Sequence, residues 1–134
     1  MGTITKQIEL EVSAEKAWDA VRDFGELHTR LVRGFVTDTK LEGSGRMVTF
    51  ANGVSQLEPL VTLDEDARRL VYSAVDSPIG ATHYNAAVTV AEAAAGTSVV
   101  SWQVDFLPDE IAPALDAAME AGAASMRQTL SSES

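Results

Sequence analysis

The sequence contains no cysteine, and this excludes disulfide frameworks, cysteine nucleophiles and metal sites with cysteine ligands. Basic residues are also few, because 10 Lys and Arg stand against 20 Asp and Glu and leave a net charge of −10. A negative chain is a poor partner for nucleic acid or an anionic membrane surface, since both require a positive field. We therefore expect no nucleic-acid partner and no membrane partner.

Long apolar runs are missing as well. No stretch approaches the ~20 apolar residues that a bilayer-spanning helix requires. Residues 1–12 alternate between polar and apolar side chains instead of forming the continuous apolar segment of a signal peptide. These patterns predict a cytoplasmic protein.

Aromatic residues make up only 6% of the chain, whereas hydrophobic residues as a whole reach 46% and alanine alone accounts for 20 of 134 residues. The length fits one domain over residues 1–134, which can fold without a disulfide or metal. Small apolar side chains are therefore plentiful and bulky ones scarce. Such a composition indicates either a core poor in bulk or space left open inside the fold.

Hydrophobic periodicity divides the chain into strands and helices. Residues 3–12 alternate with period two, with Lys6 on the apolar face, which predicts a strand with one buried face. Ser13 is a suitable N-cap for a helix over residues 13–24, and a short second helix is expected over 26–32. We expect further strands at 35–42, 46–51, 54–63, 69–75, 82–91 and 97–107, and a final helix at 111–130.

The order of these elements is a strand, two helices, about six antiparallel strands and one long helix. Asn52-Gly53, between two of the strands, is a signal for a two-residue hairpin turn. The chain has no internal repeat and no linker. The pattern therefore predicts an α+β fold with one antiparallel sheet packed against the last helix.

Six segments, in this order, resemble motifs of the helix-grip superfamily, the START-like or SRPBCC group that includes polyketide cyclases and birch-allergen-like proteins. They are SAEKAW (13–18), RDFGELH (22–28), GR with NG (45–46 and 52–53), LDE with RRLVY (63–65 and 68–72), HY with VTV (83–84 and 88–90) and WQVDF (102–106). The resemblance covers essentially the whole chain. It is strongest to the polyketide cyclase/dehydrase-like branch related to the plant abscisic-acid receptors.

The resemblance implies a helix-grip (Bet v 1-like) fold. In this fold a curved, antiparallel, seven-stranded sheet wraps around a long C-terminal helix, and two short helices follow the first strand. Members hold small hydrophobic or amphipathic molecules, such as lipids, polyketides or aromatic metabolites, in a cavity between sheet and helix. Together with the pattern of the last helix, the resemblance suggests as ligand-binding positions Leu31, Val48, Phe50, Glu58, Tyr72, Ala74, Tyr84, Ala86, Asp105, Ala118, Met119 and Gly122.

Sensing of abscisic acid is not expected. Leu31 stands near the position of the receptor's ligand-binding lysine, Asn52-Gly53 replaces its gate, and residues 79–81 replace its latch. We also expect no cofactor and no metal, because two isolated histidines and scattered carboxylates show none of the usual ligand spacings.

Four residues form the candidate catalytic set: Arg46, Glu58, Tyr84 and Asp105. If the strands pair as the resemblance implies, these residues converge at the cavity. One carboxyl group of a buried pair could act as a general acid or base, Arg46 could pair with it, and Tyr84 could stabilise an enolate. The alternative is an internal ion pair with a purely structural role, because such pairs also perturb pKa values.

The tryptophans and histidines allow two interpretations each. Trp18 fits the core of the first helix better than a site. Trp102 and Asp105 fall on opposite faces of their strand, and the resemblance favours Asp105 at the cavity, which leaves Trp102 to the core or to a subunit interface. His28 could contact a ligand near the cavity mouth, whereas His83 is expected at the surface.

The final helix carries many small residues, namely Ala114, Ala117, Ala118, Ala121 and Gly122. They could leave a cavity beneath the helix, or alanine could simply favour helix formation. Met119 and Met126 suit either a cavity wall or an ordinary core.

Three functions are compatible with these observations. The first is non-enzymatic binding of a small hydrophobic molecule. The second is a polyketide cyclase or dehydratase that uses the four candidate catalytic residues. The third is an interaction module that forms a homodimer through a sheet edge or the Trp102 face and retains only a vestigial cavity.

Overall fold

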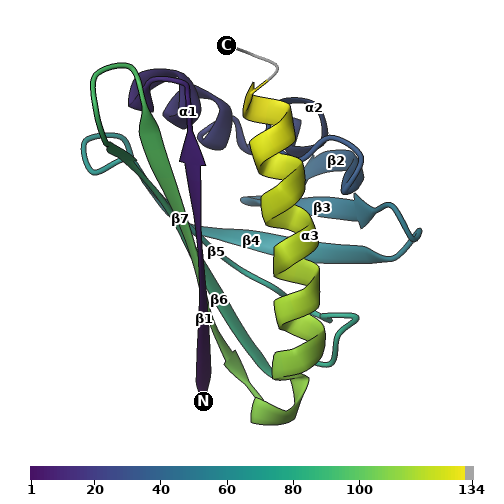
Figure 1. The fold of residues 1–134 in the computed structure, drawn as a ribbon. Helices are drawn as coiled ribbons and strands as arrows, with labels where there is room; N and C mark the ends of the chain where they lie inside the picture. The colour runs from purple at the N-terminus through teal and green to yellow at the C-terminus, as the bar shows by residue number, and fades with distance from the viewer. Residues whose placement is uncertain (132–134) are drawn as a thin grey trace.

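The computed structural model describes residues 1–131, and Figure 1 shows a sheet that curves around one long helix. The elements in chain order are β1 (Gly2–Leu10), α1 (Ala14–Val21), η1 (Phe24–Glu26), α2 (Leu27–Arg30), β2 (Val36–Glu42), β3 (Gly45–Phe50), β4 (Ser55–Asp64), β5 (Arg69–Ser73), β6 (His83–Glu92), β7 (Ser98–Leu107), η2 (Asp109–Ile111) and α3 (Ala112–Ser131).

Within the described residues, seven strands form one antiparallel sheet in the order β1-β7-β6-β5-β4-β3-β2. The first and last strands are neighbours, with Gly2 opposite Phe106 and Leu10 opposite Ser98. In Figure 1, α3 runs beside β1 along the concave side of the sheet, while β3 and β4 pass nearly across it. The predicted α+β architecture is therefore confirmed.

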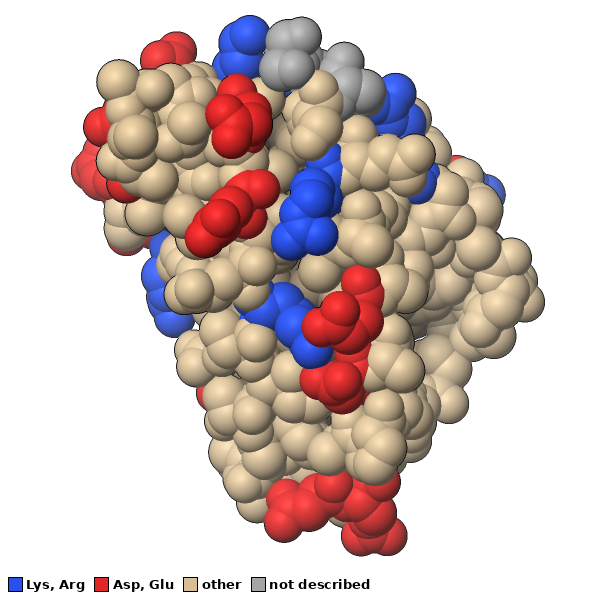
Figure 2. Space-filling view, in the orientation of Figure 1, with Lys and Arg blue, Asp and Glu red and all other residues tan. Residues whose placement is uncertain are grey.

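Lys6 ties α3 to β1. The side chain lies on the inward-facing side of β1, as the alternation predicts, and its Nζ is 2.8 Å from Asp116 Oδ1 and 2.6 Å from Glu120 Oε1 on α3. Figure 2 shows such pairing on one face of the molecule, where blue side chains lie next to red ones. The few cations on this face are thus interspersed with acids and do not form a continuous positive patch.

The first helix begins and ends for local reasons. Ser13 is its N-cap, and the Ser13 hydroxyl oxygen accepts a hydrogen bond of 3.1 Å from the backbone N–H of Lys16. The helix ends at Val21, earlier than predicted, because Asp23 leaves the helical region at φ −80° and ψ 76°. The predicted second helix over 26–32 is likewise reduced to Leu27–Arg30.

The turn between β3 and β4 differs from the two-residue hairpin that Asn52-Gly53 predicts. The N–H of Phe50 donates to the carbonyl of Val54 at 2.8 Å, so three residues lie in the loop. Gly53 adopts φ +86°, a left-handed conformation that suits glycine, and the Asn52 side chain accepts a bond from the Val54 N–H. The glycine therefore serves a three-residue loop, which is the next most common hairpin geometry.

The small residues of α3 do not all face the sheet, as the cavity interpretation of this helix would require. Ala114, Ala117 and Ala121 are exposed, and only Ala118 and Gly122 of that set face inward. The inner face consists mainly of larger side chains such as Leu115 and Met119 (the full buried set is Leu115, Met119, Gly122, Ala123, Met126, Thr129 and Leu130). The three exposed alanines favour the helix through their intrinsic propensity, and because they face outward they do not border any internal space.

The C-terminal part of α3 is held by the segment that follows α2. The Arg33 N–H donates to Thr129 Oγ1 at 3.0 Å, and Ser125 Oγ donates to the Arg33 carbonyl at 2.9 Å. Among residues 1–131, none of the helices has both the length and the apolar character required to cross a bilayer.

Candidate functional site

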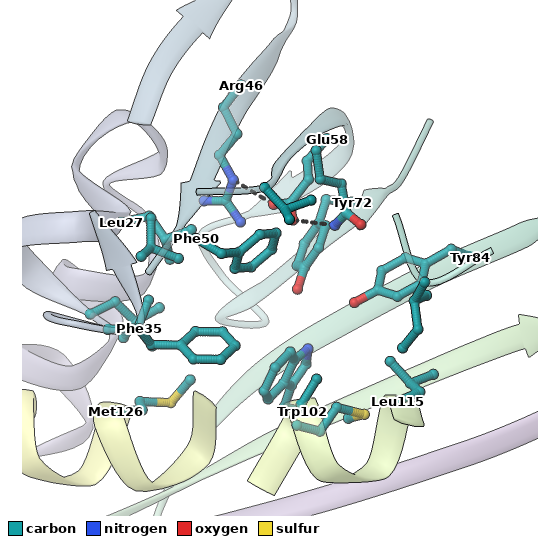
Figure 3. Close-up of a pocket in the computed structure, with 18 of the residues that line it drawn as sticks. Leu27, Phe35, Arg46, Phe50, Glu58, Tyr72, Tyr84, Trp102, Leu115 and Met126 are labelled. Carbon is teal, nitrogen blue, oxygen red and sulfur yellow. Dashed lines mark hydrogen bonds and ion pairs between the residues drawn. The ribbon is translucent and has the colours of Figure 1, made fainter. Parts of the chain in front are cut away.

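A cavity of about 500 Å³ lies between the concave face of the sheet and α3. Figure 3 shows residues of its wall, which come from α2, the strands and α3 and point toward a common space. The wall is mainly apolar and aromatic. Its polar members are Arg46, Asn52, Gln56, Glu58, Tyr72, Tyr84 and Trp102.

The structure brings most of the predicted residues to this cavity. Those that line it are Leu31, Arg46, Phe50, Glu58, Tyr72, Tyr84, Ala118 and Met119. Val48 and Ala86 share the inner face with them but are completely buried in the hydrophobic core, and Ala74 packs against that core. Gly122 also lies outside the lining, directly behind Trp102.

Asp105 does not face the cavity, so its predicted catalytic and ligand-binding position is wrong. Its Oδ1 accepts a 2.7 Å hydrogen bond from the Thr3 hydroxyl on the neighbouring strand β1. The inner face of β7 is formed by the buried Trp102, Val104 and Phe106. The alternation of β7 therefore assigns Trp102, not Asp105, to the cavity, and this inward position also removes the Trp102 face as a dimer interface.

Arg46 and Glu58 form a buried ion pair in the cavity wall. They are direct partners in the β3–β4 register, and Arg46 Nε lies 2.8 Å from Glu58 Oε1. Gln56 Nε2 donates to the other carboxylate oxygen at 2.8 Å, and a guanidinium N–H donates to the Phe24 carbonyl at 3.2 Å. Both oxygens of Glu58 are thus already engaged, which is the arrangement that the structural ion-pair interpretation anticipates.

The guanidinium of Arg46 also contacts two aromatic rings. Its Cζ lies 4.1 Å from the ring centre of Phe24 and 5.0 Å from that of Tyr72. Both distances allow a cation–π interaction. The Arg46 charge is therefore satisfied by a carboxylate, a carbonyl and two rings before any ligand enters.

Tyr72 and Tyr84 are neighbours, with ring centres 6.3 Å apart. Burial is the main cause that raises the pKa of the Tyr72 hydroxyl, and the negative charge of Glu58 raises it further. Burial likewise raises the pKa of Tyr84 well above its ordinary value, with Tyr72 and Glu58 as further causes. Both phenols therefore stay protonated, so they can donate hydrogen bonds but cannot serve as bases at ordinary pH.

Sequence reasoning missed a large part of the cavity wall. The missed residues are Leu27, Val32, Phe35, Val36, Ala51, Asn52, Val54, Gln56, Leu70, Pro78, Ile79, Val88, Trp102 and Leu115. Met126, for which cavity wall and core were both left open, lines the cavity. The signal for Gln56 was available, because it lies two positions before Glu58 on the same face of β4. The loop residues Asn52, Pro78 and Ile79 have no such periodic signal.

The remaining candidates lie away from the cavity. His83 is exposed, as expected. His28 is half-buried and does not line the cavity, and its Nδ1 has no hydrogen-bond partner within the described residues. Trp18 is buried in the core and donates through its indole N–H to Glu65 at 2.7 Å. Within residues 1–131 no group of three or more His, Asp or Glu could hold a metal ion.

The curved antiparallel sheet that grips a C-terminal helix defines the START-like, helix-grip class of proteins. Residues 1–132 match the family described as polyketide cyclase / dehydrase and lipid transport, and the chain belongs to this family. The resemblance inferred from the sequence motifs is thereby confirmed. A comparison with curated proteins gave no match.

Solved structures share the fold over nearly the whole chain. The protein XoxI from Bacillus cereus is 24% identical, with a TM-score of 0.87 over 97% of this chain and 96% of that chain. A START superfamily protein from Mycobacterium smegmatis is 11% identical, with a TM-score of 0.81 over 98% and 99%. Norcoclaurine synthase from Thalictrum flavum is 15% identical, with a TM-score of 0.72 over 95% and 84%. At these identities the likeness concerns the fold alone.

Proposed function

We propose that the protein binds a small hydrophobic or amphipathic molecule, such as a lipid, a polyketide or an aromatic metabolite, in the cavity between the sheet and α3. The observation that carries the proposal is the cavity itself, with a volume of about 500 Å³ and a mainly apolar wall. Pockets for small molecules typically measure ~300–1,000 Å³ and combine apolar walls with a few polar groups.

The position of the cavity supports entry from one end. Asn52 and Val54 of the β3–β4 loop and Pro78 of the segment between β5 and β6 belong to its wall and are exposed to solvent. These residues form a rim where a ligand can pass between solvent and the buried wall. Two short loops therefore border the opening, and the rigid sheet and α3 form the remainder.

Filling the cavity from α3 tests this proposal. Ala118 lines the cavity, whereas its neighbour Ala117 is exposed on the same helix, so Ala118→Phe and Ala117→Phe form a matched pair. Binding of the uncharged fluorescent probe N-phenyl-1-naphthylamine and native mass spectrometry of small molecules retained from the host report occupancy. We expect Ala118→Phe to weaken probe binding at least about tenfold and Ala117→Phe to leave it unchanged. Equal effects of the two variants, or no binding to the wild type, would contradict the proposal.

A second candidate is a cyclase or dehydratase. The observation that favours it is the pair of protonated phenols, Tyr72 and Tyr84, which could donate to the enolate oxygen of a carbonyl-rich substrate. Glu58 is the carboxylate of the cavity wall, and its use as an acid or base requires Arg46 and Gln56 to release an oxygen. Turnover of a linear poly-β-ketone, followed by the absorbance of an aromatic product, separates the candidates. An enzyme loses turnover but keeps binding in Tyr84→Phe, and a binder shows no turnover at all.

A further inference from the structure

We propose that Gln56 is a ligand-binding residue whose side-chain oxygen accepts a hydrogen bond from an uncharged O–H or N–H group of the ligand. Glu58 is its positioning residue, because it holds the Gln56 amide in the orientation that this bond requires. The inference rests on the proposed function, which assigns only a hydrophobic or amphipathic ligand to the cavity. It adds the chemical group that the ligand carries and the residue that recognises it.

The first observation is an acceptor without a partner. Gln56 is only 6% exposed and belongs to the cavity wall. Its Nε2 donates to Glu58 Oε2 at 2.8 Å, whereas its Oε1 accepts no side-chain or backbone hydrogen bond from residues 1–131. Among those residues, the unpartnered side-chain atoms that have essentially no accessible surface are His28 Nδ1, Thr39 Oγ1, Ser77 Oγ and Trp102 Nε1. Gln56 Oε1 is not one of them, so a molecule in the cavity can reach it. Buried polar atoms are normally hydrogen-bonded, and the ligand supplies the missing donor.

The second observation is that the orientation of this amide is fixed. A glutamine amide can turn end for end, which exchanges its donor nitrogen and its acceptor oxygen. Glu58 forms an ion pair with Arg46, which Figure 3 marks with a dashed line, and a carboxylate has no hydrogen to donate. The amide of Gln56 therefore presents its nitrogen to Glu58 and turns its oxygen away from it. The buried ion pair thus determines which end of the amide meets a ligand.

The other polar groups of the wall are already engaged. The hydroxyls of Tyr72 and Tyr84 interact with each other, and that of Tyr72 also interacts with the Trp102 indole. At the rim, Asn52 Oδ1 accepts a 3.0 Å hydrogen bond from the backbone N–H of Val54. A ligand donor that enters the mainly apolar cavity therefore finds its available acceptor at Gln56.

The charges of the wall favour an uncharged donor. Arg46 and Glu58 neutralise each other, so a ligand ammonium group would add a buried charge that has no counter-charge of its own. A ligand carboxylate, ketone or ether has no hydrogen to donate and would leave Gln56 Oε1 without a partner. An alcohol, a phenol or a neutral N–H group supplies the hydrogen and adds no charge. These groups are therefore the best match for the site.

The test measures three ligands on the wild type and on Gln56→Met, which replaces the amide with an apolar side chain of similar length. 2-Naphthol carries a hydroxyl, 2-methoxynaphthalene keeps the oxygen without its hydrogen, and 2-methylnaphthalene has neither. Comparison of the two proteins for each ligand cancels the different solubilities of the ligands in water. We expect Gln56→Met to weaken 2-naphthol binding roughly 3- to 10-fold, and to leave the other two ligands within about twofold or bound more tightly.

The outcomes separate this inference from the proposed function. Gln103→Met makes the same exchange at an exposed position of β7 and should change none of the three affinities. An equal loss for all three ligands in Gln56→Met would identify a packing role only and overturn the inference, as would an unchanged affinity for 2-naphthol. In either case the proposed function stands. If none of the three ligands binds to the wild type, the proposed function fails as well.

Nuclear magnetic resonance of the wild type does not depend on the folding of any variant. The exposed glutamines Gln7, Gln103 and Gln128 serve as internal references for the side-chain signals of Gln56. Without ligand, the Gln56 amide proton that is bonded to Glu58 should lie downfield of the reference amide protons. Saturation with 2-naphthol should then shift the Gln56 Cδ signal downfield as Oε1 accepts a bond, whereas 2-methoxynaphthalene should not.

Two results of this measurement would contradict the inference. A Gln56 amide proton at the position of the references would show that Glu58 does not hold the amide. A Cδ signal that responds equally to the two bound ligands would show that Oε1 accepts no hydrogen bond from the hydroxyl.

Discussion

Arg46 and Glu58 meet across the β3–β4 pairing with Nε 2.8 Å from Oε1, and their side chains are only 3% and 5% exposed. The pair is part of the cavity wall, although its charges are directed at each other. Removal of one partner from such a pair leaves the other charge buried and uncompensated. This relationship yields the first prediction.

Glu58→Gln should lower the free energy of unfolding by about 3 kcal/mol or more, because the Arg46 guanidinium loses its counter-charge. Urea denaturation followed by circular dichroism measures the change. Asp38→Asn is the control, because Asp38 lies 4.0 Å from Lys40 in an exposed pair and should contribute less than about 1 kcal/mol. A loss for Glu58→Gln as small as that of the control would show that the buried pair is not needed for stability.

The tyrosine hydroxyls should not ionise in the folded protein at pH values where free tyrosine does. Tyr72 and Tyr84 are the two tyrosines of the chain, and the pKa of each is raised above the ordinary value of 10.0. Their contribution to stability is therefore fully present below pH 10 and is lost as the pH rises above it. Absorbance at 295 nm should remain flat through pH 10 in the native protein and rise near pH 10 in urea. A native transition near pH 10 would contradict the buried, protonated state.

Asp105→Asn should leave ligand binding unchanged, because the carboxylate lies outside the cavity and accepts a bond from Thr3. We expect the affinity for N-phenyl-1-naphthylamine to stay within about twofold and the unfolding free energy to fall by about 1 kcal/mol or less. Thr3→Val removes the same hydrogen bond from the other side. The two variants combined should cost less than the sum of their separate effects. A large loss of probe binding in Asp105→Asn would show that this residue contributes to the ligand-binding site.

Glu65 should stabilise the protein only above acidic pH. The hydrogen bond from Arg22, together with that from the Trp18 indole, lowers the pKa of Glu65 below its ordinary value of 4.5. A lowered pKa contributes stability that is present above the unfolded-state value and is lost as the pH falls through the folded-state value. The melting temperature of Glu65→Gln should therefore lie below that of the wild type at pH 7, and the gap should close below about pH 4.5. A gap that stays constant down to pH 3 would contradict the assignment.

The repeating parts of the fold were predictable, because each depends on local chemistry. The alternation of β1 gave its buried face, and Ser13 marked the start of α1. The positions of Arg46 and Glu58 on facing strands followed from the hairpin that joins β3 and β4. Element ends were less predictable, as the early end of α1 and the three-residue turn around Gly53 show. These ends depend on individual backbone angles that no periodic pattern encodes.

The cavity wall was only partly predictable. Alternation separated Trp102 from Asp105 but could not say which of the two faces inward, and the preference for a charged site residue gave the wrong answer. Burial of an indole gains more than burial of a carboxylate, so the apolar residue occupies the inner face. Gly122 packs directly against the Trp102 ring, a contact between α3 and β7. Such contacts between distant segments depend on tertiary packing, and no local sequence pattern reveals them.

The pairing of β1 with β7 also has a consequence for how the chain folds. Gly2 lies opposite Phe106, so the first strand cannot join the sheet until almost the whole chain is available. Contacts over such sequence separations slow folding, because the loop between the partners must close first. During synthesis β1 has no strand to pair with until β7 follows. Its apolar side chains Ile8 and Leu10, which are buried in the folded protein, stay uncovered until then. Docking of β1 is therefore among the last steps in completing the sheet.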